Sequence, residues 1–202
     1  MLPQLKTNIK KISILAGLLL LVFLILDFNY FYANLEYLFH KPNISGQYAV
    51  APSSVALKTP NMVYVDSLGI EAPVIYIDKV GEKYFQAALI NGVVHYPKTA
   101  LPGQLGNDYI FGHSSDYIWS KGKYKRIFAL LPKIQKGAEI RITDQHSTEY
   151  TYVVFDSRRV SAKDGSVLSQ QGNKRKLLTL QTSYPVGTAL ARWVVVAELK
   201  TP

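Results

Sequence analysis

Two apolar runs joined by a turn that contains proline and glycine make residues 177–199 the most informative stretch of the chain. The first run, Leu177–Leu180, leads into a polar segment that ends at Ser183. The second run, Trp193–Ala197, follows directly after Arg192. Apolar and β-branched runs bounded by Pro and Gly are typical of β-strands. The pattern therefore predicts two strands, with Ser183 ending the first and Arg192 opening the second.

Short strands separated by turns are expected along the rest of the chain from residue 62 onward. The predicted runs are Met62–Val65, Gly69–Ile77, Ala87–Val94 around the Asn91-Gly92 turn pair, Tyr109–Gly112, Ala138–Thr143 and Glu149–Phe155. Frequent short strands with turn signals indicate an all-β sandwich or barrel, and the 14 Tyr and 2 Trp residues agree with it. One helix is plausible, over Tyr124–Ile134, and Pro132 would cut it short.

The charge balance is basic, with 23 Lys and Arg against 14 Asp and Glu and a net charge of +9. Such an excess favours solubility and weak attraction to anionic surfaces. No helix-turn-helix, RRM or zinc-finger pattern is present, so nucleic-acid binding is not expected. The chain has no cysteine, which excludes disulfides and thiolate metal sites.

The N-terminal part of the chain resembles a membrane anchor. Residues 12–26 carry no charge, aromatic residues follow Asp27, and Lys10 and Lys11 precede the run. About 20 mostly apolar residues span a bilayer, and flanking lysines stay on the cytoplasmic side. No small-residue cleavage pattern follows, which favours an uncleaved anchor over a signal peptide. We therefore predict a cytoplasmic tail at 1–11, a transmembrane anchor at 12–32, a juxtamembrane helix and linker at 33–60, and an extracytoplasmic domain at 61–202.

Three segments, in this order, resemble the sortases, which are membrane-anchored cysteine transpeptidases of bacterial cell surfaces. The segment at residues 92–107 is followed by Tyr109–His113, which is similar to the sortase segment that ends in a Gly-His pair. The stretch Thr179–Ser183, then the turn and Arg192, resembles the sortase pattern TLxTC followed by a loop and an arginine. The resemblance implies a closed eight-stranded β-barrel with short helices.

The resemblance also implies a catalytic site and a reaction. It places the proton donor at His113, the nucleophile at Ser183 and the oxyanion- or substrate-orienting guanidinium at Arg192, with Thr182 lining the same site. Sortases cut a C-terminal LPxTG-type sorting signal of surface proteins between Thr and Gly. They pass the acyl group to an amine on peptidoglycan or pilin. The partners expected are these peptides, that amine and the membrane, and no cofactor is implied.

Ser183 departs from the family pattern, because sortases carry cysteine there. A free thiol has a pKa of about 8.5, whereas a hydroxyl must give its proton to an oriented base during attack. Asp108 and Asp116 flank His113 in sequence and are the candidates for orienting it; His95 is expected to be structural. We therefore expect impaired or no activity with serine at this position.

Three explanations for Ser183 stay open. The nucleophile was replaced on purpose, or the protein is a natural pseudo-sortase that binds sorting signals, or it is a true serine acyl-transferase. The rival to an enzyme is thus a membrane-tethered binding module without catalysis.

Overall fold

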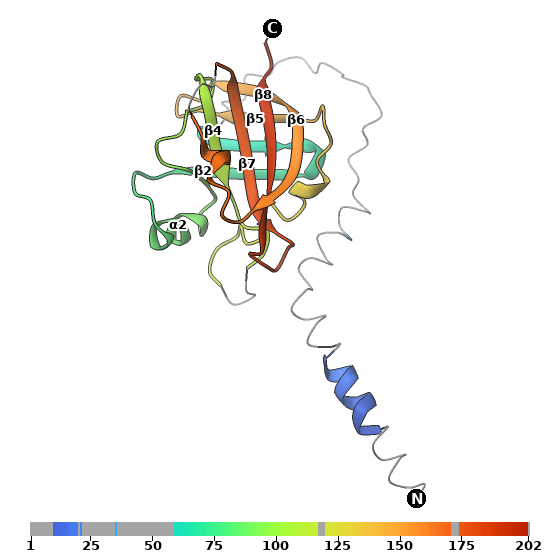
Figure 1. Ribbon diagram of the computed structural model, residues 1–202. Helices are drawn as coiled ribbons and strands as arrows, with labels where there is room; N and C mark the ends of the chain where they lie inside the picture. Colours follow the sequence, from blue (N-terminus) through green and yellow to red (C-terminus); the bar gives the residue numbers. More distant parts are fainter. Residues whose placement is uncertain are drawn as a thin grey trace, which may run out of the picture.

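Eight strands close into a barrel in the order β1-β2-β3-β4-β7-β8-β6-β5 (Figure 1). The computed structural model describes residues 10–19, 21, 35, 59–116, 120–170 and 174–201. The strands are β1 Met62–Val65, β2 Ile70–Tyr76, β3 Val93–His95, β4 Gly106–Phe111, β5 Glu139–Thr143, β6 Glu149–Ser161, β7 Lys176–Tyr184 and β8 Ala191–Leu199. The described helical elements of this domain are α2 Glu82–Leu89 and the 3-10 turns η1 Asp66–Leu68, η2 Leu131–Lys133 and η3 Gly165–Leu168. The predicted barrel with short helices is confirmed.

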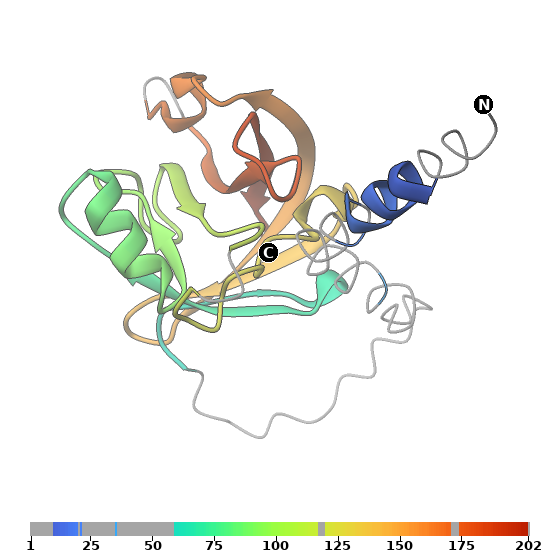
Figure 2. The same cartoon turned by 90° about the horizontal axis from the view of Figure 1, so that it is seen from below.

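Two of the strand pairs are parallel, and both matter for the site. β2 pairs with β3 in parallel, and the connection between them carries α2. β4 pairs with β7 in parallel, with Phe111 opposite Gln181. The remaining neighbours are antiparallel, including β7 and β8, which form the predicted strand–turn–strand unit. Figure 2 shows α2, in green, and the orange connection carrying η3 on different sides of the barrel.

The barrel interior is filled by alternate residues of each strand, as the period of two in a β-strand requires. On β7, Leu178 and Leu180 are fully buried in the main core, where they pack with Ile110 of β4 and Val195 of β8. Phe128 of the β4–β5 connection belongs to the same core. The intervening β7 residues face outward, and the site is built on that outer face.

Two sequence-based expectations about local structure are wrong. The segment at Asn91-Gly92 is not a hairpin turn, because Glu82–Leu89 forms α2 and leads into a strand parallel to β2. Ala88 and Leu89 bury the inner side of this helix against Val94, which explains why an apolar run there is helical. Tyr124–Ile134 is not an α-helix either: it consists of turns and the single 3-10 turn η2, with Pro132 inside it.

At the N-terminus, residues 10–19 are helical and exposed. No helix within the described residues is long and apolar enough to cross a bilayer. Most of the predicted anchor at 12–32 and nearly all of the predicted linker at 33–60 lie outside the described residues.

Candidate active site

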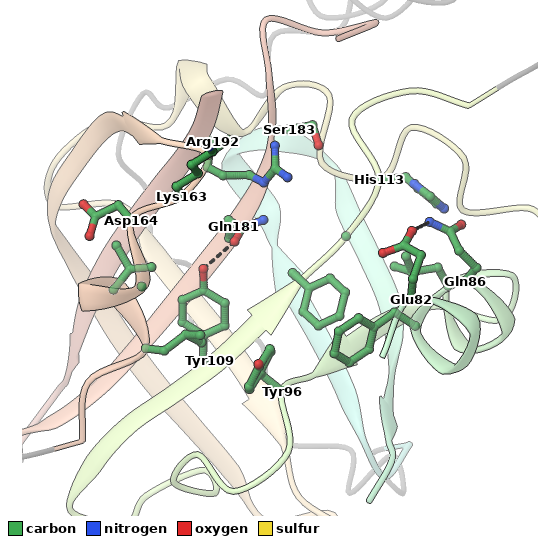
Figure 3. A pocket seen from close by; sticks show the side chains of 18 residues that line it. Glu82, Gln86, Tyr96, Tyr109, His113, Lys163, Asp164, Gln181, Ser183 and Arg192 are labelled. Carbon is green, nitrogen blue, oxygen red and sulfur yellow. Dashed lines mark hydrogen bonds between the residues drawn. The ribbon is translucent and has the colours of Figure 1, made fainter. Parts of the chain in front are cut away.

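A pocket of about 380 Å³ lies on the outer face of the barrel, over β4 and β7 (Figure 3). Helix α2 forms one wall and the η3 segment of the β6–β7 connection forms the other. The lining residues are Glu82, Phe85, Gln86, Leu89, Tyr96, Tyr109, Phe111, Gly112, His113, Ala162, Lys163, Asp164, Gly165, Val167, Leu168, Gln181, Ser183 and Arg192. His113, Ser183 and Arg192, which the sequence singles out, therefore share one pocket.

Strand register brings these three residues together. Phe111, the last residue of β4, lies opposite Gln181 of β7; His113 follows two positions after the end of β4, and Ser183 lies two positions further along β7. Ser183 is also the direct cross-strand partner of Arg192 on β8. In Figure 3, Ser183 lies between Arg192 and His113.

The Arg192 guanidinium is fixed by its own turn. Its Nη1 donates to the carbonyl oxygens of Ala189 at 3.1 Å and Ala191 at 3.0 Å. A guanidinium has five N–H donors in a rigid planar fork, so donors on Nε and Nη2 remain to meet an oxygen in the pocket. The geometry suits a group that binds a carbonyl or an oxyanion beside Ser183.

The backbone at His113 is held from several directions. Gly112 donates its N–H to the Gln181 carbonyl at 3.0 Å, and the His113 carbonyl accepts from the Phe128 N–H at 2.9 Å. A Cβ on residue 112 would lie 2.8 Å from Cδ2 of Phe128 and 2.9 Å from Cγ1 of Val93, so only glycine fits there. The imidazole position is therefore set by core packing rather than by a free loop.

A further hydrogen bond connects the histidine segment to the turn after Ser183. The Gly187 N–H donates to Oγ of Ser115 at 3.0 Å. The segment after β4 and the β7–β8 turn are thus joined by this hydrogen bond as well as by the pairing of β4 with β7. Hydrogen bonds therefore connect the segments that carry His113 and Ser183.

The pKa of His113 is lowered by burial, an effect partly offset by the negative charges of Asp116 and Glu82. The imidazole is therefore largely neutral near pH 7, because desolvation disfavours its charged form. A neutral imidazole can accept a proton from a nucleophile. Asp116 and Glu82 would then stabilise the imidazolium that forms.

Thr182 does not line the pocket. Its side chain is almost fully buried on the core-facing side of β7, and its hydroxyl donates to the Gly112 carbonyl at 2.8 Å. The threonine therefore acts on the backbone next to His113. The expectation that it lines the site is wrong in geometry, since residues 181 and 183 face the pocket and residue 182 faces the opposite side.

Asp108 is not placed to orient His113. It lies on the core-facing side of β4 with its side chain fully buried, and its Oδ1 is 3.6 Å from Nε2 of His95. Burial raises the pKa of Asp108 well above its ordinary value and lowers that of His95. His95 itself lies 3.0 Å from the Ala100 carbonyl oxygen through Nε2, in agreement with its expected structural role. Of the two candidate aspartates, only Asp116 lies near His113.

The sequence reasoning missed several residues of the pocket, chiefly on α2 and η3. It also missed Tyr109 and Gln181, whose side chains meet on the pocket floor through a hydrogen bond from the phenol to Oε1 of Gln181. Period-two alternation from Ser183 would have pointed to Gln181. Of the pocket residues on α2, only Leu89 lies in the run predicted as a strand, and the sequence pattern predicts no element over Glu82, Phe85 and Gln86.

Comparison with known proteins adds the family. The sequence pattern of the sortase domain matches residues 63–200. No curated protein matches the chain in sequence. The matched region includes every strand from β2 to β8 and all of the candidate site residues.

Several solved structures share the fold. The sortase D5 transpeptidase of Clostridium perfringens is 25% identical, with a TM-score of 0.56 over 69% of this chain and 78% of that one. Sortase E of Streptomyces avermitilis is 28% identical, with a TM-score of 0.54 over 71% of this chain and 89% of that one. Sortase C1 of Streptococcus suis, 18% identical, has a TM-score of 0.59 over 72% and 74% of the two chains and shows the fold alone. The barrel, the pocket and the matched pattern together define a transpeptidase fold, and the chain belongs to the sortase family.

Proposed function

We propose that this protein is a sortase-type transpeptidase for C-terminal, LPxTG-like sorting signals of surface proteins, with its turnover limited by Ser183. The observation that carries the proposal is the convergence of His113, Ser183 and Arg192 in one pocket of a sortase barrel. The pocket is large enough for a peptide side chain and its neighbouring backbone, since ligand sites begin at roughly 300 Å³.

The proposed reaction follows from the geometry. The side chain of residue 183 attacks the carbonyl carbon of the scissile Thr–Gly bond while His113 takes its proton. Arg192, directly across from residue 183, stabilises the oxyanion that develops on the carbonyl oxygen. His113 then gives the proton to the leaving amine, and an acyl-enzyme remains on residue 183. An acceptor amine reverses these steps and releases the joined product.

Serine makes the first step difficult. A thiolate is accessible at a pKa of about 8.5 or lower, whereas a hydroxyl needs a base during attack. His113 is largely neutral and available as a base, with Asp116 and Glu82 supplying negative charge. This arrangement favours slow acyl transfer by the protein with Ser183 and fast transfer by the Ser183→Cys variant. Serine and cysteine are similar in size, so the substitution should leave the pocket unchanged.

A second candidate is a pseudo-sortase that binds sorting signals without cleaving them. The observation that favours it is Ser183 itself. The binding pocket, Arg192 and the barrel would serve both functions, so only turnover separates the two.

We also propose that the chain is anchored in the cell membrane by residues 12–32. Its N-terminus would be cytoplasmic and the barrel extracytoplasmic. The support is the uncharged run at residues 12–26 preceded by lysines. Protease protection of intact cells or spheroplasts would test the orientation: the barrel should be cut from outside and the first residues should not.

The test of activity uses two full-length proteins, one with Ser183 and one with Ser183→Cys. Each is incubated with several LPxTG-type peptides and a primary amine. We expect acyl-enzyme and product at a much higher rate in the Ser183→Cys variant, measured by mass spectrometry. Ser169→Cys is the matched control, because it places a thiol on an exposed residue outside the pocket. The catalytic proposal fails if Ser183→Cys forms neither acyl-enzyme nor product with any of the peptides.

A further inference from the structure

His113 lines two cavities. Besides the pocket that holds Ser183 and Arg192, His113 lines a second cavity of about 340 Å³. Its lining residues are Gln86, Ala87, Leu89, Ile90, His113, Asp116, Ser120, Lys121 and Lys125. The two cavities share Gln86, Leu89 and His113, and the second contains neither Ser183 nor Arg192. The second cavity therefore reaches His113 without containing the residue that would carry the acyl group.

The wall of this second cavity is held by close packing. Gly122 has a φ of +102°, and a Cβ there would lie 2.6 Å from the Ile90 carbonyl oxygen at the end of α2. The glycine allows the segment from residue 120 to residue 125 to lie directly against the helix. At the start of that segment, Ser120 donates its hydroxyl proton to Oδ1 of Asp116 at 2.8 Å.

The charges in the second cavity differ from those in the first. Asp116 contributes a negative charge whose field reaches His113. Lys121 and Lys125 contribute positive charge, and Lys121 is exposed. A ligand with an ammonium group near Asp116 and an anionic group near Lys121 would match both signs. An amine that also carries a carboxylate has that chemistry.

We propose that the second cavity is the acceptor site, and that its ligand is a primary amine on a molecule that also carries a carboxylate. This inference rests on the proposed transpeptidase function. The first pocket is filled by the acyl chain once the acyl-enzyme has formed. The acceptor must then reach both the acyl carbon and His113 from another side, and the second cavity provides it.

The acceptor amine replaces residue 183 on the acyl carbon. The ammonium first loses one proton to water. The amine nitrogen attacks the acyl carbon and forms the new C–N bond, and its second proton passes to His113. The bond from the acyl carbon to residue 183 breaks, and residue 183 recovers a proton from His113. No oxidant, metal or further reactant is needed.

Filling the second cavity should slow acceptor use more than acylation. The test uses full-length Ser183→Cys protein with and without Ala87→Trp, because Ala87 lines only the second cavity. Lys83→Trp is the matched control: it adds the same indole to α2 at an exposed residue that lines neither cavity. Acylation is followed as peptide cleavage without amine, and transfer as the ratio of aminolysis to hydrolysis. We expect that ratio to fall at least tenfold in Ala87→Trp and to be unchanged in Lys83→Trp.

A second measurement tests the carboxylate. Triglycine and triglycine amide have the same amine and differ only in their C-terminal charge. A partly exposed ion pair is worth a few-fold in affinity, so we expect the acceptor KM of triglycine to be about threefold lower than that of the amide. Lys121→Gln should abolish the difference without changing the KM of the amide.

The outcomes distinguish the two proposals. If Ser183→Cys acylates but neither Ala87→Trp nor Lys121→Gln changes acceptor use, the acceptor site is elsewhere and the transpeptidase proposal stands. If Ala87→Trp lowers the ratio of aminolysis to hydrolysis while triglycine and its amide have the same acceptor KM, the cavity is the acceptor site but the carboxylate assignment is wrong. If Ser183→Cys does not acylate at all, both proposals fail.

Discussion

The hydrogen bond from the Thr182 hydroxyl to the Gly112 carbonyl offers the sharpest test of how the barrel holds His113 in position. Thr182→Val keeps the shape and β-branching of the side chain and removes only the hydroxyl that donates to the Gly112 carbonyl at 2.8 Å. Because Thr182 is only 1% exposed, water cannot replace the lost donor. Leaving a buried acceptor unpaired costs about 1–3 kcal/mol. For a domain of this size, that corresponds to a fall in Tm of roughly 3–10 °C.

Thr182→Val should lower kcat by more than the loss of folded protein can explain. The carbonyl that loses its partner belongs to the residue before His113, so the imidazole loses part of its positional restraint. In the Ser183→Cys background we expect kcat to fall about tenfold at a temperature where the protein remains folded, because small misplacements of a catalytic group are costly. Urea unfolding followed by circular dichroism gives the free energy, and peptide cleavage gives kcat.

The chain offers a matched control for this substitution. The hydroxyl of Thr188 donates to the Pro185 carbonyl at the same distance, 2.8 Å, but the residue is exposed. Thr188→Val should cost no more than about 0.5 kcal/mol, since surface substitutions seldom cost more. Equal losses of stability in Thr182→Val and Thr188→Val would refute the argument from burial.

Two further predictions concern charged side chains. Arg192→Ala in the Ser183→Cys protein should reduce kcat by about 10²–10³-fold, the usual cost of losing an oxyanion donor, while Tm stays the same; a collapsed fold would instead show the arginine to be structural. Burial raises the pKa of Asp108 in the folded state. The contribution of protonated Asp108 to the free energy of unfolding is therefore complete below its unfolded pKa near 3.8, and it is lost as the pH rises towards the folded pKa. Asp108→Asn should therefore gain stability relative to the parent protein between pH 4 and 7 in urea titrations, and parallel pH profiles for the two proteins would contradict this.

The sequence was sufficient for the parts of the fold that depend on local pattern and family resemblance. The strands that carry Ser183 and Arg192 alternate and end at clear turn residues, and the Gly-His pair fits the family segment. The sequence pattern does not predict helix α2, because Ala88 and Leu89 fit a buried strand as well as the inner side of a short helix. Only its packing on Val94 distinguishes the two.

The candidate site was predictable to the extent that its residues lie in motifs. The resemblance to the TLxTC pattern implies that Thr182 lines the pocket, but neighbouring residues on a strand face opposite sides, and Thr182 faces the core. Asp108 is a candidate only because it lies close to His113 in sequence, and the structure places its side chain in the barrel interior. The second cavity carries no sequence signal, since it depends on the approach of Gly122 to Ile90.

The parallel pairing of β4 with β7 also bears on how activity arises during folding. His113 and Ser183 are 70 positions apart, and the pairing of β4 with β7 brings the chain around them side by side. Closing so long a stretch of chain is slow compared with forming the hairpin of β7 and β8. A refolding chain should therefore acquire its strand content before any reactivity at residue 183. Recovery of peptide cleavage would then report the closure of the barrel itself, and no fragment that lacks either strand should react.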